Sequence, residues 1–190
     1  NISSVSVGNP AIISAPKSTS DLILLFSLNV HSMIIDKLDD KRGQWTAISD
    51  QVMGGISEVT FSEFTDGKEK FYRLEGNVST KNNGGFIQSV IKFPVDANNF
   101  KGVRFTVRGT NDDYYLWLRT PASRFPWDRY IASFKPNEDW SIIEIPFSSL
   151  QKSNFYMPRK INSSKIRTIA FAAYGKDFEA KLDIANIELY

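Results

Sequence analysis

The chain has 190 residues, of which 42% are hydrophobic and 13% aromatic, a composition sufficient for one all-β domain with a sizeable core. Its 23 Lys and Arg residues nearly balance 21 Asp and Glu residues, so the net charge of +2 does not by itself indicate a polyanionic partner. The absence of cysteine excludes disulfides and thiolate chemistry, and the single histidine, His31, excludes a metal site built from several histidines.

Residues 1–30 lack the alternating pattern of the rest of the chain, and Pro10 and Pro16 argue against regular structure there. We interpret them as an extended N-terminal arm, followed by one domain over residues 31–190. The apolar segment 22–28 is too short to span a bilayer and fits an edge strand or short helix, with partner docking as the alternative. For residues 1–20 we favour docking, because they have little apolar surface to bury. The start at Asn1 is consistent with a processed N-terminus or with a partial sequence.

From about residue 30 onward, short strand-like segments alternate with turn-forming residues, at the spacing typical of sandwiches and barrels. The clearest strand has Val103, Phe105 and Val107 alternating with polar side chains. Ten strands are predicted, at residues 45–49, 57–61, 71–74, 86–93, 102–109, 114–120, 129–134, 141–145, 166–173 and 182–189. Ten strands indicate an all-β sandwich of two packed, mostly antiparallel sheets.

The strands at 102–109 and 114–120 are joined by residues with hairpin-loop chemistry, so we expect them to pair. Their outward side chains then form one cationic and aromatic surface, which comprises Arg104, Arg108, Tyr115, Trp117 and Arg119. The following segment adds Arg124, Trp127 and Arg129. Because Arg, Trp and Tyr are enriched at interface hot spots, we predict that these residues bind a protein partner.

Two other binding classes remain open for the same segment. A carbohydrate- or small-ligand-binding module would need exposed aromatic platforms, and the candidates are Tyr115, Trp117, Trp127 and Tyr130, although each type is more often buried in a core. An RNA-binding factor would use cations interleaved with aromatic rings, namely Arg119, Arg124, Arg129 and Lys135 with Phe125, Trp127 and Tyr130. The near-neutral charge makes nucleic acid the less favoured partner.

Catalytic and cofactor motifs are missing from the sequence. His31 stands without a Gly-x-Ser-x-Gly element, and no Gly-x-Gly-x-x-Gly segment is present. The neighbouring carboxylates Asp39–Asp40 and Asp112–Asp113 fit solvated loop charge, with a calcium site as the alternative. We therefore predict a non-enzymatic protein with no catalytic residue, no metal and no cofactor.

Two glycine clusters, at residues 50–57 and 79–86, stand out from the remaining loops. Paired glycines, and asparagines before them, suit positive φ angles and close backbone approach, so we interpret both clusters as structural turns. A ligand-binding rim is the alternative. With one upstream tryptophan, the motif residues are Trp45, Asp50, Met53, Gly54, Gly55, Ser57, Asn82, Asn83, Gly84, Gly85 and Phe86.

In this order, the motif residues resemble the complex I intermediate-associated protein 30 family, and the similarity extends over about residues 33–190. The resemblance implies a galactose-binding-like jelly roll without transferable catalytic residues. Members of that family serve as mitochondrial NADH dehydrogenase assembly factors and, in cyanobacteria and chloroplasts, act on photosynthetic complexes.

From this resemblance we expect a chaperone-like assembly factor or scaffold that binds protein subunits of a large energy-converting complex. The complex is either photosynthetic, such as a photosystem or antenna, or respiratory. The protein is expected to lie peripheral to the membrane part of such a complex. A chloroplast location, stromal or thylakoid-associated, is favoured over the mitochondrial matrix.

Overall fold

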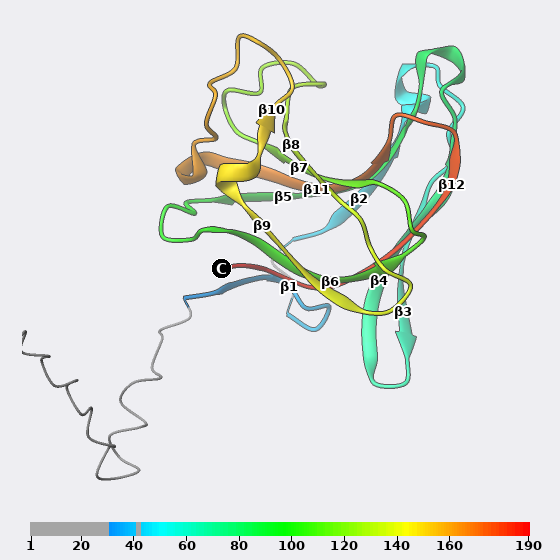
Figure 1. The fold of residues 1–190 in the computed structure, drawn as a ribbon, viewed down its shortest axis with the longest axis horizontal. Helices are drawn as coiled ribbons and strands as arrows, with labels where there is room; N and C mark the ends of the chain where they lie inside the picture. The colour runs from blue at the N-terminus through cyan, green and yellow to red at the C-terminus, as the bar shows by residue number, and fades with distance from the viewer. Residues whose placement is uncertain (1–30, 41–42) are drawn as a thin grey trace, which may run out of the picture. The chain divides into compact units, whose positions relative to one another are not determined.

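The computed structural model describes residues 31–40 and 43–190 (Figure 1). The arm predicted for residues 1–30, with its apolar segment 22–28, lies outside the described residues. Residues 31–190 form one compact unit. Within the described part of the chain, we find no helix with the length and apolar character that a membrane crossing requires.

The strands of the described residues form two six-stranded antiparallel sheets, which we name sheet A and sheet B (Figure 1). Sheet A has the order β3-β4-β12-β6-β9, with β1 beside β12, and sheet B has the order β10-β8-β7-β11-β5-β2. The strands of sheet A are β1 (Met33–Asp36), β3 (Thr60–Asp66), β4 (Glu69–Val78), β6 (Gly102–Gly109), β9 (Ser141–Pro146) and β12 (Phe178–Leu189). Those of sheet B are β2 (Trp45–Ser49), β5 (Phe86–Val95), β7 (Tyr114–Arg119), β8 (Tyr130–Phe134), β10 (Gln151–Lys152) and β11 (Ile166–Tyr174). Four short 3₁₀ turns lie between them: η1 (Asp50–Met53), η2 (Lys81–Asn83), η3 (Phe147–Ser149) and η4 (Ser163–Lys165).

The core lies between the two sheets, where the inward side chains of alternating positions meet. Phe105 from sheet A and Phe171 from sheet B are fully buried, with ring centroids 4.8 Å apart in an edge-to-face arrangement. Each fully buried side chain of this kind contributes about 1.5–3 kcal/mol relative to exposure. The predicted all-β jelly-roll sandwich of two antiparallel sheets is confirmed.

The predicted pairing of residues 102–109 with 114–120 is wrong. Strand β6 pairs with β12 and β9 in sheet A, whereas β7 pairs with β11 and β8 in sheet B. Residues 110–113 therefore cross from one sheet to the other. Turn-forming residues permit either connection, and the alternation of each strand shows only that one of its faces is buried.

Most other predicted strands are present, but β4 and β12 are longer than predicted, with 10 and 12 residues. Two short strands, β1 and β10, were not predicted. The strand predicted at 57–61 begins instead at Thr60. Ser57 lies before it because its backbone N–H and its hydroxyl both donate hydrogen bonds to Asp50.

Candidate partner-binding surface

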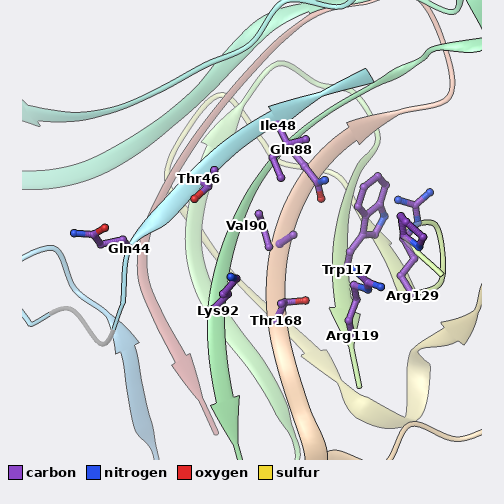
Figure 2. Close-up of a pocket in the computed structure, with 12 residues that line it drawn as sticks. Gln44, Thr46, Ile48, Gln88, Val90, Lys92, Trp117, Arg119, Arg129 and Thr168 are labelled. Carbon is purple, nitrogen blue, oxygen red and sulfur yellow. The ribbon is translucent and has the colours of Figure 1, made fainter. Parts of the chain in front are cut away.

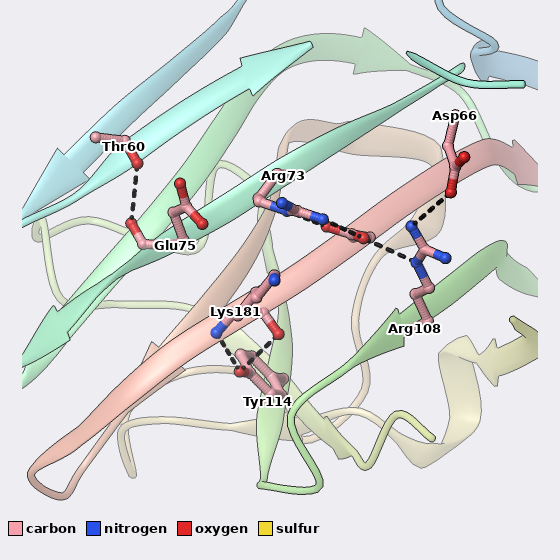
Figure 3. A network of polar contacts seen from close by, with 8 residues as sticks. Thr60, Asp66, Arg73, Glu75, Arg108, Tyr114 and Lys181 are labelled. Carbon is pink, nitrogen blue, oxygen red and sulfur yellow. Dashed lines mark hydrogen bonds and ion pairs between the residues drawn. The ribbon is translucent and has the colours of Figure 1, made fainter. Parts of the chain in front are cut away.

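The outer face of sheet A carries arginines that are each held by a carboxylate (Figure 3). Asp183, which is 3% exposed, accepts from Arg73 Nε at 2.6 Å and from Arg108 Nε at 2.9 Å. Arg104 Nε lies 2.8 Å from Glu188 and its Nη1 lies 3.2 Å from Glu144. The three arginines of this face are therefore neutralised within the protein.

The predicted continuous surface does not form. Arg104 and Arg108 lie on β6 in sheet A, whereas Tyr115, Trp117 and Arg119 lie on β7 in sheet B. Since outward residues of the two sheets of a sandwich point to opposite sides, the two groups belong to separate surfaces. Sequence reasoning joined them only because it paired the two strands.

A groove of about 670 Å³ lies on the outer face of sheet B (Figure 2). Its floor includes Val90 and Ala170, which are paired in register and carry short side chains that leave room above the sheet. Trp117 flanks Ala170 on one side, and Thr46 flanks Val90 on the other. The volume falls within the range of about 300–1,000 Å³ typical of ligand sites.

Trp117 is covered by Arg129, contrary to the prediction of an exposed platform. The indole is 3% exposed, and the Arg129 guanidinium carbon lies 3.6 Å from its ring centroid. Burial lowers the pKa of Arg129; the nearby Arg119 lowers it further, while Tyr174 raises it. Such a desolvated cation–π contact is worth about 2 kcal/mol. The pair forms a fixed cationic wall of the groove.

The other predicted sugar platforms differ in exposure. Tyr130 is fully buried, and its hydroxyl donates to the carbonyl of Pro158 at 3.1 Å, so it is unavailable to a ligand. Tyr115 is half-buried and meets Tyr174 edge to face. Trp127 is 54% exposed. Of the four rings, Trp127 is thus the most exposed.

Three cations line the groove: Lys92, Arg119 and Arg129. Arg119 Nη2 donates to the Phe125 carbonyl at 2.8 Å, which ties the groove to the adjoining loop. Three buried donors, Arg119 Nε, Arg129 Nε and Trp117 Nε1, have no acceptor among the described residues. None of the three groove cations has a carboxylate partner among the described residues, whereas Arg73, Arg104 and Arg108 on sheet A each have one.

Asp128 braces the loop beside the groove. Its carboxylate is fully buried and accepts from the backbone N–H groups of Arg124 and Phe125, both at 3.0 Å. It also accepts from Asn154 Nδ2 at 2.6 Å and from the Tyr156 hydroxyl. Burial raises the pKa of Asp128, but these hydrogen bonds outweigh it and hold the pKa below its ordinary value.

This loop and the loop after β10, which Asp128 holds through Asn154 and Tyr156, display exposed aromatic side chains. We call them the aromatic rim: Phe125, Trp127, Phe155 and Tyr156. Phe125 and Trp127 stack almost in parallel with centroids 5.2 Å apart, and Phe155 is 88% exposed. Sequence reasoning included Trp127 and the exposed Arg124 but missed Phe155 and Tyr156. The signal was a pair of adjacent aromatic residues in a segment without strand alternation.

The two glycine clusters meet at Asp50. Its fully buried carboxylate accepts from Ser57 Oγ and Gly85 N, both at 2.5 Å, and from Phe86 N at 3.2 Å. Burial raises the pKa of Asp50, but the hydrogen bonds from Gly85, Ser57 and Phe86 lower it by a larger amount, so the net shift is downward. The carboxylate therefore joins two loops that are distant in the sequence.

The motif glycines serve this junction in two ways. Gly54 and Gly85 adopt positive φ angles of +89° and +119°, as predicted for a turn. Gly84 has φ −80°, and it must be glycine for another reason: a Cβ there, or at Gly55, would overlap the Asp50 carboxylate. Asn82 and Asn83 both have φ +58°.

The remaining motif residues lie at the edges of the core. Trp45 donates from Nε1 to Asp36 at 2.8 Å and packs against Phe61 and Phe171. Met53 is 60% exposed on η1. The hydrogen bonds and packing of Asp50 and Trp45 assign bracing roles to both side chains.

One carboxylate of each pair considered for calcium forms an ion pair with a lysine. Asp39 lies 2.5 Å from Lys70, and Asp112 lies 2.6 Å from Lys176. Within residues 31–40 and 43–190, no three His, Asp or Glu side chains gather closely enough to hold a metal ion. The ring of His31 packs 5.0 Å from that of Phe100.

The fold and its grooved sheet define a galactose-binding-like jelly roll of the kind found in carbohydrate-binding modules. A family 11 carbohydrate-binding module of a cellulosomal cellulase of Clostridium thermocellum superposes with a TM-score of 0.68 at 18% identity, covering 84% of this chain and 94% of that one. A family 30 module of another Clostridium thermocellum cellulosomal cellulase gives 0.62 at 14% identity, with 85% and 98% covered. At these identities the similarity establishes the fold alone.

Residues 36–184 match the model of the Complex I intermediate-associated protein 30 (CIA30) family. The chain belongs to that family, and the resemblance inferred from the glycine clusters is confirmed. No curated protein sequence matches the chain.

Proposed function

We propose that this chain is a non-enzymatic, protein-binding assembly factor or scaffold for a large energy-converting complex. The aromatic rim is the observation that carries the proposal. Its rings are exposed, yet the buried Asp128 carboxylate is hydrogen-bonded to both loops that display them. Aromatic side chains held in place before binding lose little conformational entropy on docking, which suits an interface hot spot.

The kind of complex follows from the family. The name of the CIA30 family refers to an intermediate of complex I, which supports a partner among the subunits of a respiratory NADH dehydrogenase. A photosynthetic complex is the other branch of the proposal, together with a chloroplast location and a peripheral position on the complex. Fractionation of chloroplasts and mitochondria, followed by immunodetection of the chain, distinguishes the two branches.

The absence of catalysis is also part of the proposal. The buried carboxylates Asp50 and Asp128 each accept several hydrogen bonds from neighbouring backbone and side-chain groups. A carboxylate held in this way is stabilised as the anion and is a poor general base or acid at neutral pH. These groups stabilise the loops rather than offering a reactive proton.

Affinity purification of the tagged chain from its native cells, with quantitative mass spectrometry, tests the proposal. We expect subunits of one energy-converting complex, and we expect the Trp127→Ala/Phe155→Ala variant to recover them with roughly tenfold lower yield. Ile142→Ala is the matched control, since Ile142 is 68% exposed on sheet A. Recovery of no such subunit, or equal recovery by the rim variant, contradicts the proposal.

A carbohydrate-binding module is the second candidate, and the groove on a carbohydrate-binding-module fold favours it. The covered indole of Trp117 argues against it, because a neutral sugar needs an open ring face or several neutral polar partners. Titration calorimetry with oligosaccharides separates the two. Specific sugar binding that is lost on substitution of Gln88 or Thr168 would move this candidate to first place.

A further inference from the structure

Carboxylates pair with the arginines on the outer face of sheet A, but not with the cations in the groove of sheet B. On sheet A, Arg73 and Arg108 are paired with Asp183 (Figure 3), and Arg104 is paired with Glu188. On sheet B, no carboxylate of the described residues lies within ion-pair distance of Lys92 or Arg129. Arg129 is partly buried, and an unpaired cation that is partly desolvated reduces the stability of a fold, so a counter-anion from outside would be favourable there. Lys92 is exposed and free to join the same anion.

The register of sheet B places these cations in order across the groove. Thr168 pairs with Lys92 on one side and with Arg119 on the other (Figure 2). Neighbouring strands lie about 4.8 Å apart, so the backbones at Lys92 and Arg119 are separated by about 10 Å. Arg129 stands over Trp117 at the wall of the same groove. The three cations are therefore spread over the groove rather than converging on one point.

Buried donors without acceptors mark the same wall. Arg119 Nε, Arg129 Nε and Trp117 Nε1 are unsatisfied within the described part of the chain. These three atoms are themselves buried, so an external carboxylate would bind only the outer nitrogens of a guanidinium, in the usual two-pronged way, and offset its charge. The wall is thus suited to planar carboxylates.

We propose that the groove on sheet B binds an acidic, extended segment of a partner protein, whose carboxylates pair with Lys92, Arg119 and Arg129. The inference rests on the proposed function, since it takes the occupant to be a protein. An extended chain advances about 3.3 Å per residue, so acidic residues two to four positions apart match the cation spacing.

Charge complementarity identifies the occupant as a separate chain. Residues 1–30 contain a single acidic residue, Asp21, and therefore cannot supply several carboxylates. The neutral polar side chains Gln44, Thr46 and Gln88 line the rest of the groove and can bond a peptide backbone. The aromatic rim adjoins the groove through Pro126, so a protein could contact both.

Fluorescence anisotropy with the full chain tests the inference. The probe is a short labelled peptide with glutamate at every second position, and the control peptide has glutamine instead. We expect the glutamate peptide to bind, the affinity to fall as salt rises, and the glutamine peptide to bind at least about tenfold more weakly.

Two charge-matched double variants locate the site. Lys92→Met/Arg129→Met should weaken glutamate-peptide binding by about tenfold or more, whereas Lys68→Met/Lys101→Met should not. Methionine retains an apolar stem over Trp117, and thermal melting verifies that both variants fold. Equal binding by the two double variants, or no binding of the glutamate peptide to the parent chain, overturns the inference.

Two further outcomes separate the inference from the proposed function. Binding of an acidic polysaccharide or an oligonucleotide, but not of the peptide, overturns the protein occupant. If Lys92→Met/Arg129→Met still recovers complex subunits in the affinity purification while the rim variant does not, the groove inference fails and the proposed function stands.

Discussion

A single buried carboxylate joins the two glycine clusters of this chain. Gly85 lies 35 residues from Asp50, yet its backbone N–H donates to that carboxylate at 2.5 Å. Ser57 donates to the same carboxylate from the other cluster. The spacing of glycines in the sequence indicated turns, but it did not reveal which acceptor the turns enclose. That acceptor explains why Gly84 is a glycine at an ordinary φ angle.

Asp50→Asn should destabilise the fold by roughly 1–3 kcal/mol at neutral pH, because one carboxylate oxygen is replaced by an NH₂ group that faces N–H and O–H donors. The pKa of Asp50 is lowered in the folded state, so its stabilising effect is complete above its ordinary value of 3.8 and disappears as pH falls through the lowered value. Urea denaturation at several pH values should show the gap between parent and variant closing in acid. Equal stability of the two at neutral pH would contradict this role.

Gly84→Ala should also destabilise the fold, by roughly 1–3 kcal/mol, since the added methyl group overlaps the Asp50 carboxylate. A double-mutant cycle isolates the cause. In an Asp50→Ala background the space is vacated, and the same substitution should cost markedly less. Additive losses in thermal or chemical denaturation would show that the clash is not with Asp50.

At the scale of strands and loops, local pattern and long-range pairing carry different information. The alternation of Val103, Phe105 and Val107 predicted β6 with its observed bounds. Its neighbours could not be predicted, because β12 comes from the far end of the chain and β9 follows only after β8. The groove could not be predicted for the same reason. Lys92 and Arg119 come to lie on the same face, two strands apart, only because β5 and β7 both pair with β11 in a particular register.

The aromatic rim depends on its loop, and Asp128→Asn should loosen it. In the variant, an NH₂ group replaces one of the two carboxylate oxygens. This group faces hydrogen-bond donors and cannot accept the bonds that the oxygen accepted. Because the loop lies outside the core, we expect a melting temperature close to that of the parent but faster tryptic cleavage after Arg124. Asp139→Asn, at an exposed loop position, is the control. Unchanged cleavage would contradict bracing by Asp128.

At the scale of the whole described domain, the two outer faces of the sandwich differ in how their cations are paired. Sheet A pairs its arginines internally, whereas sheet B carries the groove with unpaired cations. The aromatic rim adjoins that groove through Pro126. The fold is shared with carbohydrate-binding modules, but a covered Trp117 and the unpaired cations give this groove a chemistry suited to acidic protein segments.

Site-specific photo-crosslinking in the native assembly tests the central claim that the sheet B side binds a protein partner. A photoreactive residue is placed either at Pro126, between the rim rings, or at Ile142, exposed on sheet A. We predict crosslinks from position 126 to a subunit of an energy-converting complex, and few from position 142. Crosslinks to such a subunit from position 142 alone would contradict the account.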